Sequence, residues 1–197
     1  MSGANTPRLE TERLILRRFT PEDVPAIYEI LGDPKVNEFV PFRLSSPEDA
    51  RRFYEEHYAE AYRKPQGCAY AICLKDTGRV IGYIGAATDE PYDLGYGLRP
   101  EFWRQGYVSE AARAVTQLMK EQGLPYVTAT HDVENPRSGR VMRAIGMTYR
   151  YTYHEHWEAG DRWVWFRMYQ LDLNGESGTY MGYWDKYPEH RIEENLD

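Results

Sequence analysis

The segment from residue 93 to residue 111 constrains the fold of this chain more than any other. It predicts a strand over 93–98, a short loop, and a helix of about 108–122 that begins just after Gly106. Backbone N–H groups at a helix start have no intrahelical partners and carry the positive end of the helix dipole. Because glycine lets a backbone approach a ligand closely, the loop predicts an anion site, with donors on Gln105, Tyr107, Val108 and Ser109.

Two common phosphate loops are excluded by the residues present. The chain has no Gly-Lys-Ser/Thr loop of a nucleoside-triphosphate site, and no G-x-G-x-x-G follows its first strand. Gly106 taken alone is more typical of an ordinary turn before a helix, so its role has to be judged from the rest of the chain.

Hydrophobic periodicity elsewhere predicts strands and helices in one order. Helices are expected after the N-cap residues Thr20 and Ser46 and over 138–145. The buried stripe of the second helix is expected to be Ala50, Phe53, Tyr54, His57 and Ala61. Strands are expected at 12–19, 69–74, 79–86, 126–130, 149–157 and 162–173. This order predicts an α/β fold, a mixed and mostly antiparallel central sheet of about seven strands with helices on both faces.

With 197 residues, the chain is long enough for one full-sized core. We expect a single domain over residues 8–174 and an acidic, aromatic C-terminal extension over 175–197. The aromatic residues of this extension leave two alternatives open, a disordered end or an ordered arm packed on the domain or on a neighbouring subunit. They are Tyr180, Tyr183, Trp184 and Tyr187.

A net charge of −7 argues against nucleic-acid binding, because a phosphate backbone is held mainly by positive charge. The basic residues nevertheless cluster at two loops. These residues are Arg99 and Arg104 at one loop, and Arg137, Arg140 and Arg143 after another. Such a distribution suits a small polyanionic ligand better than a polymer.

The sequence also bears on compartment. No segment reaches the length of a membrane-spanning helix, and the first residues lack the regions of a signal peptide. Cys68 and Cys73 are five positions apart and would point to opposite faces of a strand, which disfavours a disulfide. We therefore expect a cytoplasmic protein with two free thiols and no membrane partner.

Four separated segments make the chain resemble a known family. They read TERLILR with PED at 11–17 and 21–23, DLGYGL at 93–98, WRQGYVSEA at 103–111, and NPRSGRVMRAIGM at 135–147. In this order and spacing they resemble the GNAT superfamily of N-acetyltransferases, in the branch that includes the ribosomal-protein alanine and serine N-acetyltransferases. The third segment resembles that branch's W-G-x-G-Y-A-x-E-A loop, and the fourth resembles its N-x-x-S-x-x-V-x-x-K-x-G-F/M pattern.

Three residues depart from the family pattern. Trp103 stands where the wider superfamily has Gln or Arg, as is usual in this branch. Val108 replaces the last small residue of the loop, and Arg143 replaces a lysine and keeps its charge. None of these changes removes a backbone donor, so the resemblance still implies acetyl-CoA as co-substrate, without a metal.

The resemblance also implies where acetyl-CoA binds. Its pantetheine arm would pair with the strand edge at Leu98 and its neighbours, and its pyrophosphate would sit on the N–H groups of 104–109. Asn135 would bond the pantetheine end, and one of the arginines on the following helix would meet the 3′-phosphate. The implied binding residues are Leu98, Arg99, Arg104, Gln105, Gly106, Tyr107, Val108, Ser109, Asn135, Ser138 and Arg143.

The resemblance implies direct attack by a primary amine in a ternary complex, which needs a base and an acid. Asp93 stands where many relatives carry a glutamate base, and an exposed aspartate at a strand start is an equal alternative. His131 is a candidate proton relay, or a core or capping histidine. Ser138, three residues after Asn135, fits the branch's serine as general acid and also as helix N-cap. Other superfamily members use a tyrosine at the position of Met142.

The sequence leaves the acceptor open between a protein N-terminus and a small-molecule amine. It also leaves open whether the protein forms a homodimer. The resemblance places the acceptor between the first two helices and the final hairpin. That hairpin carries Tyr149, Tyr151, Tyr153, His154, His156, Trp157, Trp163 and Trp165, with Glu155 and Glu158 near them. A non-catalytic acyl-CoA-binding module is the alternative function, and an adaptor that uses the aromatic tail is a third.

Overall fold

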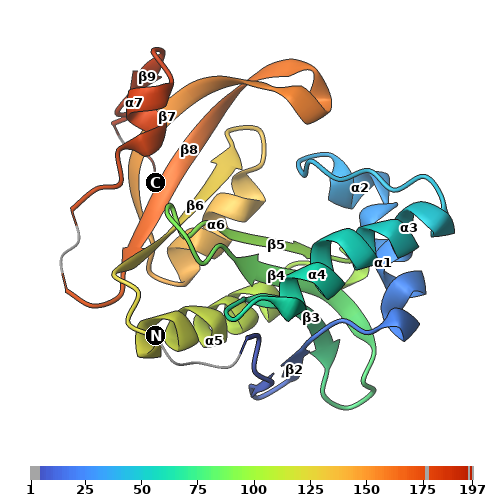
Figure 1. Ribbon diagram of the computed structural model, residues 1–197. Coiled ribbons are helices and arrows are strands. Elements are labelled where there is room, and N and C mark those ends of the chain that lie inside the picture. Colours follow the sequence, from blue (N-terminus) through green and yellow to red (C-terminus); the bar gives the residue numbers. More distant parts are fainter. Residues whose placement is uncertain (1–4, 176–177, 195, 197) are drawn as a thin grey trace.

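The computed structural model describes residues 5–175, 178–194 and 196 and contains two β-sheets flanked by helices (Figure 1). The first sheet is antiparallel, with its strands in chain order. They are β1 (Leu9–Glu10), β2 (Leu14–Arg17), β3 (Ala69–Leu74), β4 (Val80–Ala86) and β5 (Leu94–Leu98). β5 is therefore an edge strand of this sheet.

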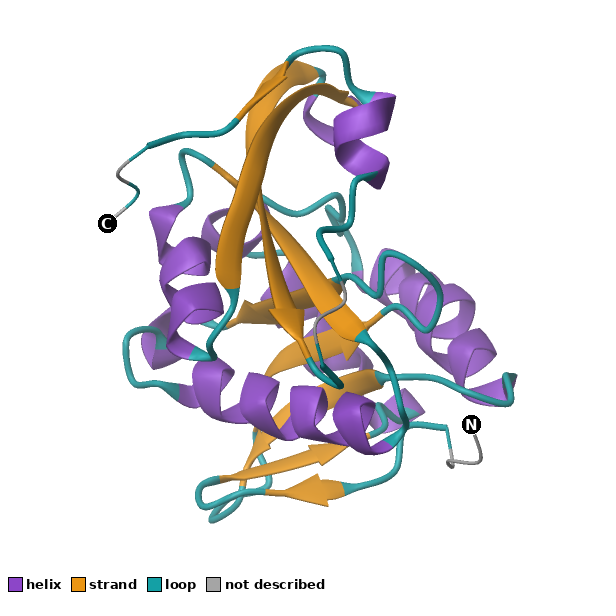
Figure 2. Ribbon diagram, turned by 90° about the vertical axis from the view of Figure 1, so that its left-hand side faces the viewer, coloured by secondary structure: helices purple, strands orange, loops and turns teal. Residues whose placement is uncertain are grey.

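The second sheet has the order β6-β8-β7-β9 and is also antiparallel. Its strands are β6 (Tyr126–Asp132), β7 (Thr148–Trp157), β8 (Arg162–Asp172) and β9 (His190–Arg191), with the short helix η4 (Glu158–Gly160) between β7 and β8. Figure 2 shows the long β7–β8 hairpin standing away from the first sheet.

The two sheets meet at one point, a parallel bridge between Asp93 and Thr128. Beyond this bridge β5 and β6 diverge, and neither pairs with the other. The α/β class with a mostly antiparallel arrangement is confirmed, but the single sheet of about seven strands is divided into two. The short strands β1 and β9 were not expected from the sequence.

The N-terminal helices cover one face of the first sheet. They are η1 (Pro21–Asp23), α1 (Val24–Leu31), α2 (Pro34–Asn37), α3 (Pro47–Phe53), η2 (Tyr54–Ala59) and α4 (Glu60–Arg63). Both expected starts are present: the N–H of Thr20 donates to the Asp23 carboxylate at 2.8 Å, and the Ser46 hydroxyl accepts from the N–H of Asp49 at 3.1 Å.

The buried stripe predicted for the second helix is wrong in its second half. Ala50 and Phe53 are buried, but His57 is exposed and Tyr58 is buried in its place. The cause is η2, a π-helical turn that adds a residue to the turn and so rotates the following side chains by one position.

The opposite face of the first sheet is covered by α5 (Tyr107–Glu121), which follows η3 (Pro100–Phe102). Its Ala111, Val115 and Met119 are buried against the sheet in one core cluster. The helix α6 (Pro136–Ala144) follows β6 and buries Met142 in the same cluster. Helices thus lie on both faces, as the sequence predicts.

The C-terminal arm, defined here as residues 178–194, packs on the second sheet of its own chain. It contains α7 (Gly182–Lys186) and β9, which pairs with β7. Of the two alternatives for the tail, the ordered arm is therefore the one observed over these residues. Cys68 and Cys73 are free thiols, as expected. Across the described parts of the chain, no helix has the length and apolar content needed to cross a membrane.

Candidate functional site

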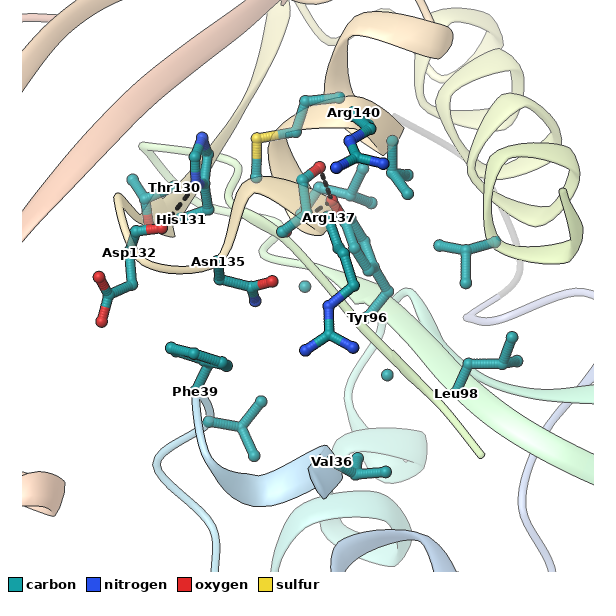
Figure 3. A pocket seen from close by; sticks show the side chains of 18 of the residues that line it. Val36, Phe39, Tyr96, Leu98, Thr130, His131, Asp132, Asn135, Arg137 and Arg140 are labelled. Carbon is teal, nitrogen blue, oxygen red and sulfur yellow. Dashed lines mark hydrogen bonds between the residues drawn. The ribbon is translucent and has the colours of Figure 1, made fainter. Parts of the chain in front are cut away.

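A cavity of about 880 Å³ lies where the two sheets diverge (Figure 3). β5 forms one wall, and the end of β6 with the start of α6 forms the facing wall. The loop before α5 closes one end of the cavity. The segment 35–42, the β7–β8 hairpin and α7 surround the other end.

The edge of β5 that faces the cavity carries backbone groups for a ligand. The N–H of Ala87 donates to the Asp93 carbonyl and the N–H of Arg99 donates to the Ile81 carbonyl, so the odd-numbered residues of β5 bond to β4. Because backbone groups alternate along a strand, Leu94, Tyr96 and Leu98 point theirs to the unpaired edge.

One group on this edge is already engaged. The indole N–H of Trp103 donates to the carbonyl of Leu98 at 2.7 Å. The backbone N–H and carbonyl of Tyr96 remain directed at the cavity, and no strand in the described part of the chain pairs with this edge. An extended amide-containing ligand can therefore add to β5 as a further strand.

The start of α5 forms the second binding element. Gly106 is its N-cap with φ of 80°, and Arg104 also has a positive φ of 61°. The first intrahelical bond runs from the N–H of Glu110 to the carbonyl of Gly106, so the N–H groups of 107–109 have no helical partner. These residues line the cavity, which places the positive end of a 15-residue helix there.

Arg13, the residue before β2, holds this loop from the outside. It donates to the carbonyl of Gln105 at 2.9 Å and to the carboxylate of Glu110 at 2.7 Å, and its guanidinium lies 4.4 Å from the Tyr107 ring centroid. The loop that precedes α5 is therefore fixed by a side chain that does not enter the cavity.

Three arginines supply positive charge along the cavity, and none of them has a carboxylate partner among the described residues. They are Arg104, Arg137 and Arg140. Arg137 stacks on the indole of Trp103, 4.4 Å from the ring centroid, and so links the start of α6 to the loop before α5. Charges held in this way at a helix N-terminus favour phosphate groups.

Three predicted binding residues do not line the cavity. The N–H of Arg99 is bonded to β4, and its guanidinium pairs with Glu29 of α1 at 2.5 Å. The Gln105 side chain donates to the carbonyl of Glu101. Arg143 lies on the exposed side of α6 and donates to the Tyr169 hydroxyl. The remaining predicted residues do line it: Asp93, Leu98, Arg104, Gly106, Tyr107, Val108, Ser109, His131, Asn135 and Ser138.

Asp93 lies at the bridge where the sheets part. Its Oδ1 accepts from the Thr128 hydroxyl at 2.9 Å. Burial raises the pKa of this carboxyl to about 6, and the bond from Thr128 lowers it only in part. A carboxylate with a pKa close to neutral pH is suited to accept a proton from an amine.

His131 sits at the end of β6 and is buried, with 4% of its surface exposed. Its Nδ1 is 2.7 Å from the carbonyl of Asp132, which only a protonated Nδ1 can bond, so Nε2 is the unprotonated nitrogen. Burial lowers the pKa of His131, which keeps it neutral. A side chain on Gly139 would contact Nε2 at 2.6 Å, so α6 packs directly against this ring.

Ser138 on α6 makes a contact that the sequence did not reveal. The hydroxyl of Tyr96 lies 2.9 Å from Ser138 Oγ and donates to the Ser138 carbonyl at 3.0 Å. Burial raises the pKa of Tyr96, so its hydroxyl remains a proton donor. Tyr96 and Ser138 therefore form one hydroxyl pair in the wall of the cavity that Asn135 also lines, and Figure 3 shows the side chains of Tyr96 and Asn135 there.

Tyr96 was missed because no spacing along the chain links strand β5 to helix α6. The signal available was its place two residues before Leu98 on a predicted edge strand, which puts it on the same side of the strand as Leu98. Only the three-dimensional arrangement shows that its hydroxyl meets Ser138, which lies 42 positions later.

The far end of the cavity is aromatic. Of the predicted hairpin residues, Tyr153, Glu155 and Trp157 line it, since alternate residues of β7 share one face. The other predicted hairpin aromatics and Glu158 do not. Further lining residues are Val36, Phe39, Phe42, Phe166, Tyr183, Lys186 and Tyr187.

An open strand edge, a helix N-terminus and three arginines without a carboxylate partner among the described residues meet in one cavity, a combination that suits an extended ligand carrying amides and phosphates. The chain belongs to the GNAT acetyltransferase family: the family model of the acetyltransferase (GNAT) domain matches residues 13–148. The family resemblance read from the sequence is confirmed.

Individual relatives agree with this assignment. The chain is 30% identical to an uncharacterized N-acetyltransferase, YnaD, of Bacillus subtilis (strain 168), over 172 residues that cover 85% of this chain and 98% of the relative. A solved acetyltransferase (GNAT family) from Bacillus anthracis has a TM-score of 0.76 at 26% identity, covering 85% of this chain and 99% of that one. RimL, a ribosomal L7/L12 α-N-protein acetyltransferase solved in complex with coenzyme A, shares the fold with a TM-score of 0.73 at 18% identity, covering 86% and 100%.

Proposed function

We propose that this protein is an N-acetyltransferase that moves the acetyl group of acetyl-CoA onto a primary amine by direct attack. The observation that carries the proposal is the junction of the open β5 edge with the start of α5 in one cavity. Membership of the GNAT family and the coenzyme A complex of the similarly folded RimL support it.

Each group of acetyl-CoA has a part of the cavity that suits it. The backbone of Tyr96 and the N–H of Leu98 suit the amides of the pantetheine arm. The N–H groups of 107–109 suit the pyrophosphate, and Asn135 suits the pantetheine end. Arg137 and Arg140, rather than Arg143, suit the 3′-phosphate side because they line the cavity.

The same geometry supports a role for each reacting group. Asp93 takes one proton from the bound ammonium, which frees the nitrogen lone pair to attack the thioester carbon. The carbon–sulfur bond then breaks, and the Ser138 hydroxyl, joined to Tyr96, gives its proton to the leaving thiolate. The second nitrogen proton and the proton held by Asp93 leave to solvent, and solvent returns one proton to the serine. The products are the N-acetylated amine, free CoA and one proton.

His131 has a smaller part in this account. Because its unprotonated Nε2 is buried against Gly139, it serves as a support for α6 and Ser138 and not as the base. The reaction needs neither a metal nor nucleic acid. The two free thiols are typical of a cytoplasmic protein, and we propose the cytoplasm as the place of this reaction. We assign the activity to residues 8–174 with the C-terminal arm attached.

The test is release of thiol from acetyl-CoA, read with a chromogenic thiol reagent, over peptides with free N-termini, polyamines, amino acids and aromatic amines. The Gly106→Glu variant is run beside the wild type as a control with a blocked loop. Turnover with one amine class that is lost in the variant supports the transferase. Binding of CoA without turnover on any amine would favour the non-catalytic acyl-CoA-binding alternative, and no CoA binding would overturn both.

A further inference from the structure

The C-terminal arm is part of the folded core at the far end of the cavity. The Tyr151 hydroxyl donates to the carbonyl of Tyr180 at 2.8 Å, and Glu193, only 15% exposed, pairs with Arg167 of β8 at 2.6 Å. Tyr151 and Tyr153 of β7 are 1% and 3% exposed because the arm covers them. The arm therefore contributes to the burial of both rings.

The arm also reaches the cavity itself, through Tyr183, Lys186 and Tyr187. The ring of Tyr153 is stacked between two rings of the arm, at 5.0 Å from Tyr183 with an interplanar angle of 18° and at 5.0 Å from Tyr187 with an angle of 10°. The arm therefore holds Tyr153 of the hairpin in place and adds two aromatic rings, those of Tyr183 and Tyr187, to the same cavity wall.

This end of the cavity has a distinct chemistry. Aromatic rings approach it from four segments: the residues after α2 with Phe39, β7 with Tyr153 and Trp157, β8 with Phe166, and the arm with its tyrosines. The hairpin adds one carboxylate, Glu155, to the lining. The pKa of Lys186 is raised mainly by its hydrogen bond to Tyr187 and, to a smaller extent, by the negative charge of Glu155. The Nζ of Lys186 already lies 4.8 Å from the Tyr187 ring centroid, so the aromatic rings at this end are suited to pack against a flat aromatic group and not to hold a further cation.

We infer that the C-terminal arm is the acceptor-specificity element of this protein, and that the acceptor is a small primary amine bearing an aromatic group. This inference rests on the proposed function, since it names the acceptor of that reaction. The amine points along the cavity toward Asp93, and its ring packs among Phe39, Tyr183 and Tyr187. Lys186 at the same end disfavours acceptors with several positive charges, such as polyamines.

The test compares 2-phenylethylamine with 2-cyclohexylethylamine, which has a similar shape but no aromatic face, and with spermidine. The variants are Tyr183→Leu and Tyr187→Leu, which keep an apolar side chain and remove the ring. The control is Ile192→Ala, on the same arm but 68% exposed and outside the cavity. Acetyl transfer gives KM and kcat, and calorimetry on the CoA-loaded protein gives amine affinity without turnover.

We expect 2-phenylethylamine to have a KM about threefold to tenfold below that of 2-cyclohexylethylamine, because only the aromatic ring forms aromatic pairs with the protein, and each leucine variant to remove about that factor. Affinity for CoA stays at the wild-type value in both variants, and Ile192→Ala changes neither quantity. Equal KM values for the two amines, preference for spermidine, or absence of amine binding in calorimetry would overturn the inference. The proposed function fails separately, by loss of CoA binding or of thiol release in the wild type.

Discussion

Gly106 gives the sharpest test of the loop before α5. It permits a left-handed backbone and it leaves room for a phosphate, and different substitutions test these two roles separately. It has a φ of 80°, and a Cβ placed there would meet only Arg13 Nη2, at an ordinary 3.5 Å. Gly106→Ala therefore adds backbone strain without a clash. Gly106→Glu adds the same strain and a negative charge where the pyrophosphate is proposed to bind.

The chain supplies a matched control at the other end of the same helix. Gly123 has a φ of 83°, a Cβ placed there would meet nothing within 4 Å, and the residue is not part of the cavity lining. A left-handed conformation costs a non-glycine residue about 1 kcal/mol, which lowers Tm by about 2–4 °C in a chain of this size. Alanine at either position should show this shift equally.

Affinity for CoA should separate the two glutamate variants. One added charge near two phosphates costs about 2 kcal/mol at the high effective dielectric of an exposed site, which is more than tenfold in Kd. Calorimetric titration with CoA should thus show that loss for Gly106→Glu, reduced at high salt, and wild-type affinity for Gly123→Glu. Wild-type affinity in Gly106→Glu, or equal losses in both, would refute the assignment of the loop.

Three further predictions concern the cavity. Asp93→Asn should lower kcat by about 10²–10⁴-fold. It should also remove the rise of wild-type activity with pH through about 6, because only the ionised carboxylate accepts a proton. An unchanged pH profile would exclude Asp93 as base. Tyr96→Phe and Ser138→Ala should each lower kcat about tenfold or more with little change in the KM for acetyl-CoA. The double variant should lose less activity than the product of the two single losses, since the two hydroxyls act together. A loss equal to that product would show that the two hydroxyls act independently. In calorimetry, Arg137→Ala should weaken the affinity for CoA about threefold to tenfold and leave the affinity for dephospho-CoA unaffected, whereas Arg143→Ala should alter neither affinity. Equal losses of affinity for both ligands would show that Arg137 does not contact the 3′-phosphate.

The sequence was sufficient for the elements that form the half of the cavity proposed to bind acetyl-CoA. The strand 93–98, the glycine before the third helix and the segment at Asn135 each carry a local signal, either turn chemistry, a cap or a family motif. Local signals of this kind depend on residues a few positions apart, and the structure reproduces them nearly to the residue.

The features that the sequence did not predict depend on contacts between distant segments. The π-helical turn at 54–59 exchanged His57 for Tyr58 in the core, although the composition of that helix gave no sign of it. The division of the sheet at Asp93 depends on which strands pair, and the Tyr96–Ser138 contact depends on that division. The direction of Arg143 likewise depends on the rotation of α6 about its axis.

The arm was undetermined for a related reason. Its aromatic residues were visible in the sequence, but their partner surface, Tyr151 and Tyr153 on β7, is formed only when the hairpin folds. An aromatic tail without a neighbouring motif carries no information on where it packs. The structure shows the packing, and with it the wall that the arm adds to the cavity.

The central claim is tested most directly by following both products of one reaction. Acetyl-CoA with a deuterated acetyl group is incubated with the protein and an aromatic primary amine, and free thiol and labelled N-acetyl amine are quantified by mass spectrometry. The account predicts equal amounts of the two products, and no labelled protein when the amine is left out. Thiol released without acetylated amine, or label that accumulates on the protein and then passes to the amine, would contradict direct transfer within a ternary complex.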